Sequence, residues 1–539
     1  MKRILALLLL TSIITACRPT PAPQTPTQPV EASPAASSKP EAWWRDAVFY
    51  EVFVRSFNDS NGDGIGGFNG LIQKLDYIQS LGVTAIWLMP IHPSPSYHGY
   101  DVLNYYAVNP DYGTMADFKH LLDEAHKRGI KIIIDLVLNH TSSQHPFFVD
   151  ALHGPASKYY DWYIWSDKNQ GNHWHSVMGD MSKYYFGIFC DCMPDLNYNN
   201  PQVTAQMQDV TRFWLNNVGV DGFRMDAINR LIEDGSKTEN TPATHTWLKG
   251  FYTSYKADNP NAYAIGEVYG ADASLAKTYT GDQLDEVFNF EIATGILNSV
   301  KGVSNIGINS ALTFATQTLP DGNYGTFLTN HDQDRVMSVL GGDTNKAKLA
   351  AFLMLTSPGT PFIYYGEEIG MQGEKPDEDI RRPMQWDNTA NAGFTTGNPW
   401  RAPADDFSTV NVAAQTNDPN SLLSFYRDLI SLRKQKPALR TGKIILLDTG
   451  NTGVYASLRT DGTKSFLILA NLKNERVKDY SLTLKSSALA EGTYSLAPLY
   501  GSGNFGSLQM NAGGTFGAYQ PLAEIPPYGM YILQVTPTK

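Results

Sequence analysis

Residues 131–140 read Lys-Ile-Ile-Ile-Asp-Leu-Val-Leu-Asn-His, an apolar and β-branched run that ends in polar side chains. Such a run predicts a buried β-strand. Seven more runs of this kind occur between Trp43 and residue 365. In chain order the eight predicted strands are Val48–Phe57, Thr84–Pro90, Lys131–Leu138, Val220–Met225, Tyr263–Val268, Val287–Phe290, Gly325–Thr329 and Thr360–Tyr365.

Helical patterns lie between these runs, and Thr114 and Asp117 form a capping-box pattern at the start of one of them. The clearest helical patterns are Leu71–Leu81, Met115–Arg128, Val203–Asn217, Lys346–Leu355 and Leu422–Gln435. Strands and helices that alternate about eight times predict an α/β fold, a (β/α)₈ TIM barrel. The barrel is expected to occupy residues 41–140 and 201–439.

Two regions depart from this alternation. Residues 141–200 are rich in His, Tyr and Trp and lack a helical period, which predicts an inserted subdomain after the third strand. Residues 440–539 contain period-two runs such as Lys443–Leu447 and Ser465–Ala470, separated by Gly, Asn and Asp turns. They predict a C-terminal antiparallel β-sandwich domain.

The N-terminus carries an export signal. Lys2 and Arg3 precede an apolar stretch of 13 residues, which is too short to span a membrane but typical of a signal peptide over residues 1–16. Its end, Ile14-Thr15-Ala16-Cys17, resembles a bacterial lipobox, which implies a lipid anchor on Cys17. A plain secretory signal is the alternative. The Pro/Thr/Ser-rich residues 17–40 predict an extended tether that holds the body at the cell membrane, outside the cytoplasm.

The composition favours a neutral ligand. The 539 residues include 42 Lys+Arg and 53 Asp+Glu, a net charge of −11, and no basic run, so nucleic acid is not an expected partner. The chain also has 29 Tyr and 10 Trp, whose flat rings can stack on sugars.

Apart from Cys17, which is expected to carry the lipid, the chain contains only Cys190 and Cys192. A disulfide across a single residue is geometrically demanding. We therefore expect two thiols, with a local disulfide as the alternative, and no zinc site, because no further ligand lies at zinc spacing.

Four predicted strands end in side chains that could be catalytic. The third ends in Asn139-His140, the fourth reads Gly222-Phe223-Arg224-Met225-Asp226, the fifth contains Glu267, and the seventh ends in Asn330-His331-Asp332. Barrel active sites lie where the strands end. Three carboxylates that converge with two His and one Arg predict a catalytic site.

The order and surroundings of these segments resemble the α-amylase family, glycoside hydrolase family 13, over nearly everything from Trp43 onward. The resemblance implies that Asp226 is the nucleophile, Glu267 the general acid/base and Asp332 the carboxylate that stabilises the transition state. It also implies that the substrate-binding residues are Tyr100, His140, Arg224 and His331.

The residue types fit these roles. Arg224 and Asp226 lie two residues apart on one strand and share a face, so the cation keeps Asp226 ionised. Glu267 lies near that anion and should keep its proton to higher pH. A retaining glycosidase needs one ionised carboxylate, which attacks the sugar, and one protonated carboxyl group, which donates a proton to the leaving oxygen.

These features predict a retaining hydrolase of internal α-1,4-glucosidic bonds in starch and maltodextrins, an α-amylase. Exo-acting relatives have an Asp three residues before the stacking Tyr100, whereas this chain has Tyr97, which favours an open cleft. The alternatives are an α-glucosidase, a cyclomaltodextrinase or neopullulanase, or a 4-α-glucanotransferase. A non-catalytic glycan-binding lipoprotein is a remote one.

Calcium is the expected cofactor. The loop Asp59-Ser60-Asn61-Gly62-Asp63-Gly64-Ile65 offers side-chain oxygens from Asp59, Asn61 and Asp63 and the carbonyl of Ile65. It resembles the family's loop calcium site, although Gly67 stands where the family supplies another Asp. A turn without metal is the alternative. A second family calcium site, between barrel and insert, is placed in doubt by Asn229 and Arg230.

Overall fold

The structure is a computed structural model that describes residues 42–177, 180–486 and 489–538. The predicted signal peptide, Cys17 and the tether lie outside the described residues. Residues 42–539 form one compact unit. Among the described residues, no helix has both the length and the apolar character needed to cross a membrane.

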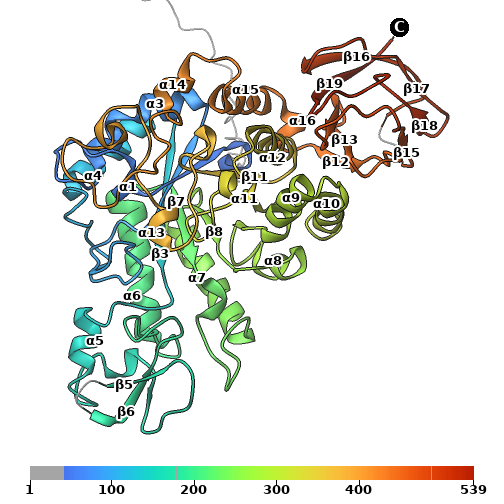
Figure 1. Cartoon of the computed structure of the whole chain (residues 1–539). Coiled ribbons are helices and arrows are strands. Elements are labelled where there is room, and N and C mark those ends of the chain that lie inside the picture. Colours follow the sequence, from blue (N-terminus) through green and yellow to red (C-terminus); the bar gives the residue numbers. More distant parts are fainter. Residues whose placement is uncertain (1–41, 178–179, 487–488, 539) are drawn as a thin grey trace, which may run out of the picture. The chain divides into compact units, whose positions relative to one another are not determined.

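Eight parallel strands form the central sheet, in the order β10-β11-β1-β2-β3-β7-β8-β9. A parallel bridge between Phe288 and Gly325 joins its two edges, so the sheet closes into the predicted barrel (Figure 1). The strands are β1 (Phe49–Val52), β2 (Ala85–Leu88), β3 (Lys131–Val137), β7 (Gly222–Asp226), β8 (Tyr263–Gly266), β9 (Glu286–Val287), β10 (Gly325–Thr326) and β11 (Thr360–Tyr364). The predicted first strand was too long, because residues 54–57 form the helical turn α1 (Val54–Phe57).

Helices separate the strands. Helix α4 (Met115–Lys127) begins with the predicted capping box, in which Thr114 and Asp117 bond each other's backbone amides. Helix α15 has the predicted bounds, Leu422–Gln435. The first predicted helix is instead two, which meet at Lys74. Other helices of the barrel are α2 (Phe68–Gln73), α3 (Leu75–Leu81), α6 (Pro201–Arg212), α7 (Pro242–Asp258), α8 (Ala273–Tyr279), α9 (Phe290–Gly302), α10 (Ile306–Thr318) and α12 (Thr344–Thr356).

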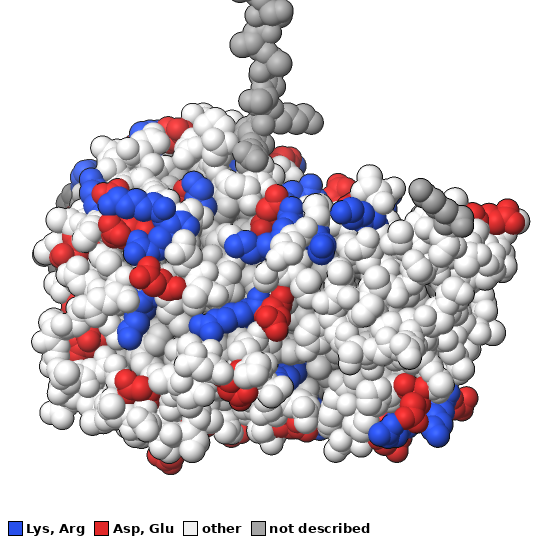
Figure 2. Space-filling model, turned by 90° about the horizontal axis from the view of Figure 1, so that it is seen from above, with Lys and Arg blue, Asp and Glu red and all other residues white. Residues whose placement is uncertain are grey.

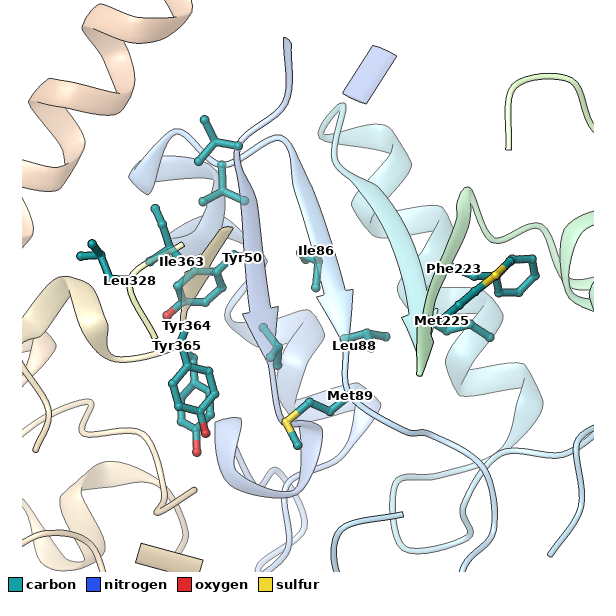
Figure 3. Close-up of a cluster of buried hydrophobic side chains, with 14 of the residues drawn as sticks. Tyr50, Ile86, Leu88, Met89, Phe223, Met225, Leu328, Ile363, Tyr364 and Tyr365 are labelled. Atoms are coloured by element: carbon teal, nitrogen blue, oxygen red, sulfur yellow. The ribbon is translucent and has the colours of Figure 1, made fainter. Parts of the chain in front are cut away.

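The alternation of side chains along each strand decides what faces the barrel interior. Tyr50, Ile86 and Phe223 belong to the large apolar cluster between strands and helices, part of which is drawn in Figure 3. The residues beside them, such as Phe49 and Trp87, fill the inside of the barrel. Because side chains alternate with period two, the polar residues near the strand ends also point inward.

The predicted insert contains helix α5 (Pro146–Ala151) and a three-stranded antiparallel sheet. Its strands are β4 (Trp165–Ser166), β5 (Trp174–Val177) and β6 (Asp180–Phe186). Cys190 and Cys192 are joined by a disulfide, so the expectation of two thiols was wrong. The turn brings their Cα atoms to 5.2 Å, within the usual range for a disulfide, despite the one-residue spacing.

The C-terminal region is an antiparallel β domain, as predicted. A six-stranded sheet and the two-stranded sheet β15-β18 enclose a separate apolar cluster. The strands are β12 (Lys443–Leu446), β13 (Val454–Thr460), β14 (Ser465–Asn471), β15 (Leu482–Leu484), β16 (Gly492–Tyr500), β17 (Leu508–Met510), β18 (Phe516–Tyr519) and β19 (Met530–Pro537).

Candidate active site

The predicted site residues meet at the C-terminal ends of the barrel strands. They surround a cavity of about 530 Å³, whose lining includes Asp226, Glu267 and Asp332. Tyr100 and His140 line it as well. Arg224 and His331 lie just beneath, with exposures of 1% and 0%. The structure therefore brings together all seven residues for which a catalytic or substrate-binding role was predicted.

Arg224 is the centre of this site. Its Nη1 lies 2.6 Å from Asp226 Oδ1, and its Nη2 lies 2.8 Å from Glu267 Oε2. One guanidinium therefore holds the two carboxyl groups as neighbours. Nη1 also donates to both oxygens of Asp135, at 2.9 and 3.1 Å. Asp135 was not among the predicted site residues, although an acid within the apolar run 131–138 was a signal that could have identified it.

Burial sets the protonation of two of these acids. It raises the pKa of Glu267 to about 7, an effect that Arg224 opposes and that the nearby Asp226 and Asp332 reinforce. Burial likewise raises the pKa of Asp135 to about 6, against the effect of Arg224. Glu267 can therefore hold a proton near neutral pH, as a general acid must.

Tyr100 and His331 form a second cluster at the floor of the cavity. Their rings stack at 5.6 Å with an interplanar angle of 13°. The Tyr100 hydroxyl lies 2.6 Å from His331 Nε2 and 3.1 Å from Asp135 Oδ2. On its other side, His331 Nδ1 lies 2.5 Å from Glu51 Oε1. The Tyr100 hydroxyl is thereby held between strand β3 and the loop after β10.

Asp332 is held by a residue that the sequence did not reveal. Arg381 donates to Asp332 Oδ1 at 2.7 Å, and it also donates to the carbonyl of His331 at 2.8 Å. Burial alone would raise the pKa of Asp332, but His331 and Arg381 outweigh it and the pKa is lowered. Arg381 follows a short helix, α13 (Asp377–Ile380), rather than a strand, so no pattern marked it.

The chain turns sharply after Asp226. Ala227 has φ 43° and ψ 40°, the left-handed conformation that residues with a side chain rarely adopt. Its amide nitrogen lies 3.4 Å from Glu267 Oε2. Such strain is concentrated at functional sites, where the surrounding structure holds it.

The cavity is flanked by aromatic side chains that are unusually open to solvent. Phe189, from the insert, is 50% exposed, and Tyr269, two residues after Glu267, is 67% exposed. Both line the cavity. Outside that lining, Tyr97 stacks on Trp400 at 5.2 Å. Exposed rings beside convergent polar groups are suited to binding sugar rings.

The family model for the α-amylase catalytic domain matches residues 51–442. The chain belongs to the α-amylase family, glycoside hydrolase family 13. α-Amylase 3 of Dictyoglomus thermophilum is 43% identical over 438 residues, which cover 80% of this chain and 86% of that protein. The oligo-1,6-glucosidase of Parageobacillus thermoglucosidasius is 34% identical over 512 residues, covering 80% and 91%.

Solved structures show the same kinship. The α-amylase from H. orenii matches with a TM-score of 0.77 at 37% identity, covering 90% of this chain and 99% of that one. The trehalose-6-phosphate hydrolase of Bacillus licheniformis matches with a TM-score of 0.80 at 29% identity, covering 92% and 100%. These relatives differ in the activities that their names state.

The loop calcium site fits the residues present only in part. The predicted ligands Asp59, Asn61, Asp63 and Ile65 do lie in one loop, but Asp59 Oδ1 already accepts from two loop amides, each at 2.9 Å. Asp59 Oδ2 accepts from the Gly64 amide at 2.8 Å and from the Thr395 hydroxyl at 2.5 Å. A cation would have to displace one of these donors.

Buried polar atoms also lie where the insert joins the end of strand β3. Among the described residues, the side-chain atoms of Asn139 and Asp195 Oδ2 are buried and make no hydrogen bond of good geometry, although the two side chains are close enough to interact. Buried polar atoms without partners are rare, and amide and carboxylate oxygens are the ligands that calcium prefers. Burial, reinforced by Glu233, raises the pKa of Asp195 well above its ordinary value, which opposes cation binding at low pH.

For the loop, we expect weak calcium binding. Millimolar calcium should raise the melting temperature slightly, because Asp59 must release a donor before it can bind the ion. The variant Gly67→Asp returns a carboxylate to the loop and should respond at lower calcium. Differential scanning fluorimetry of the two proteins across a calcium series measures both responses. If a chelator lowers the wild-type melting temperature steeply, the loop binds calcium tightly instead. If the melting temperature does not change at about 10 mM calcium, the loop does not bind the ion, because weak extracellular sites have dissociation constants of roughly 10⁻⁴–10⁻³ M.

Proposed function

We propose that this family member is a retaining α-amylase that cleaves internal α-1,4-glucosidic bonds of starch and maltodextrins. The observation that carries the proposal is the contact of one buried guanidinium, that of Arg224, with both Asp226 and Glu267 at the floor of an open cavity. A double displacement needs two carboxyl groups held close together, one ionised and one protonated.

In the first step, the Asp226 carboxylate attacks the anomeric carbon while Glu267 gives its proton to the departing glycosidic oxygen. Asp332, ionised beside Arg381, stabilises the positive charge that develops on the sugar ring. In the second step, Glu267 accepts a proton from water, which then displaces Asp226 from the glycosyl enzyme. Arg224 is buried beneath the cavity and can stay beside both acids in each step.

The walls of the cavity support an extended neutral substrate. Tyr100 lies where a flat ring can pack on the sugar that is being cleaved, and Phe189 and Tyr269 flank the opening. On the face drawn in Figure 2, acidic and basic side chains lie beside one another with wide uncharged areas between them. That face therefore has no strong field that would attract a highly charged polymer.

An exo-acting oligo-1,6-glucosidase is the second candidate, because a relative with that name is 34% identical over 80% of this chain. Tyr97 favours the endo-acting reading. Its ring packs against Trp400, where an acid would have closed the end of the pocket.

The nucleophile and the mode of attack can be tested together. Wild-type enzyme on amylose should release mixed maltooligosaccharides early, with the α-anomer first by NMR, whereas glucose from the start would mean exo attack. Asp226→Asn should lower kcat by roughly 10⁴-fold or more, because removing a nucleophile leaves only binding and electrostatic assistance. Asp282→Asn, at a side chain that is 63% exposed, is the matched control and should retain activity.

The pH profile tests the role of Glu267. Because its pKa is raised to about 7, Glu267 is protonated below that pH and loses its proton above it. We expect kcat/KM to fall about tenfold for each pH unit above the alkaline limb near 7. In Glu267→Gln the residual activity should show no such limb. If the wild-type kcat/KM instead begins to fall near pH 4.5, the general acid is a group other than Glu267.

We also propose that the protein is exported and anchored to the cell membrane by a lipid on Cys17. The support is the lipobox-like sequence before Cys17 and the Pro-rich tether after it. Cells that express the protein should incorporate labelled palmitate into it, and Cys17→Ser should abolish the label and release the protein. The Cys190→Ser/Cys192→Ser double variant should keep the label; if Cys17→Ser keeps it too, the anchor lies elsewhere.

A further inference from the structure

Glu51 is a buried acid to which the mechanism above gives no task. It lies on strand β1, and its exposure is 1%. It alternates with Phe49, which lies in the interior cluster, so its side chain also points into the barrel. A buried carboxylate is costly unless it is paired and hydrogen-bonded. Its partner should therefore explain why it is there.

The partner is His331, on the loop after β10. The Glu51 carboxylate lies 2.5 Å from His331 Nδ1, and His331 is fully buried. A carboxylate accepts hydrogen bonds only, so the proton of this contact belongs to Nδ1. A short contact between charged groups in a buried site is stronger than one in water.

The other ring nitrogen is also a donor. The Tyr100 hydroxyl is 3.1 Å from Asp135 Oδ2. Above the Asp135 pKa of about 6 its single hydrogen must go there, because an ionised carboxylate only accepts. The Tyr100 oxygen is therefore the acceptor in its 2.6 Å contact with His331 Nε2. Both nitrogens of His331 carry a proton, and the ring is an imidazolium.

The charges that face His331 agree with this assignment. Asp332 Oδ2 lies 3.4 Å from Nε2, while Asp135 and Glu267 lie across the site. Arg381, which donates to the His331 carbonyl, is the opposing cation. Burial alone would lower the pKa of His331, but Asp332 and Glu51 outweigh it and the pKa is raised.

We propose that Glu51 is a positioning residue that keeps His331 doubly protonated, so that Nε2–H stays a fixed donor toward Tyr100, whose ring lines the cavity. Its effect on catalysis rests on the proposed function, whereas the state of His331 does not. Glu51 acts through His331, since it is absent from the lining of the cavity. A neutral amide at position 51 could still accept from Nδ1 but could not hold the second proton.

The first test compares Glu51→Gln with wild type across pH. Loss of a neighbouring carboxylate lowers a histidine pKa by roughly one to three pH units. At a pH above that pKa, each unit reduces the protonated fraction about tenfold. We expect kcat/KM of Glu51→Gln to be about tenfold lower at pH 7.5 and within about twofold of wild type at pH 5, where His331 is protonated in both. A deficit that is equal at both pH values would mean a merely structural role and would overturn the proposal.

Two variants complete this test. Glu51→Asp keeps the charge and should keep the wild-type pH dependence, even where its overall activity is lower. Glu286→Gln is the matched control, because Glu286 is equally buried on β9 and bonded by the hydroxyls of Tyr263 and Thr360. It lies away from the cavity and should leave the profile unchanged.

The second test does not depend on activity. In protein labelled with ¹⁵N-histidine, the His331 signal is identified as the one that is missing from His331→Gln. We expect two ring N–H groups at pH 7 in wild type and one in Glu51→Gln. A neutral His331 in wild type overturns the proposal. A doubly protonated His331 in a protein that does not cleave starch would instead overturn the proposed function and leave the role of Glu51 intact.

Discussion

The ion pairs of Arg224 are the interaction on which the active site depends. A guanidinium with 1% exposure needs anions or other hydrogen-bond acceptors around it, and here it contacts Asp135, Asp226 and Glu267. In turn, three buried acids could not lie so close without the cation, because like charges and burial both oppose ionisation. Among these acids, Glu267 has a pKa of about 7, so it can hold a proton near neutral pH, as acid catalysis requires.

The same principle extends across the floor of the cavity. Arg224 pairs with Asp226, Arg381 with Asp332, and His331 with Glu51, so each of these six groups has a partner of opposite sign. Tyr100 links the two halves through Asp135 and His331. Such a network is rigid, because each group can make all its hydrogen bonds in only one orientation. A rigid network suits this reaction, because the catalytic groups must already be in position when the substrate binds.

The barrel could be predicted because its signals are local. Apolar runs, turn residues and the Thr114 capping box depend on neighbours in sequence, and all eight strands appeared in the predicted order. The predictions that differ from the structure concern the exact path of the backbone, which the residue pattern does not reveal. Residues 54–57 turn into a helix rather than extending the first strand, and the turn at 190–192 closes a disulfide across one residue.

The sequence by itself determined the fold, the family and the catalytic groups at the strand ends, because period-two alternation and strand order place those groups on one rim. Only the tertiary structure decided which groups pair with them. Glu51 and His331 are separated by 280 residues, and Arg381 reaches Asp332 from 49 residues away on an irregular segment. Pairing across such distances is set by barrel closure and by the need to neutralise buried charge, and neither leaves a local pattern in the chain.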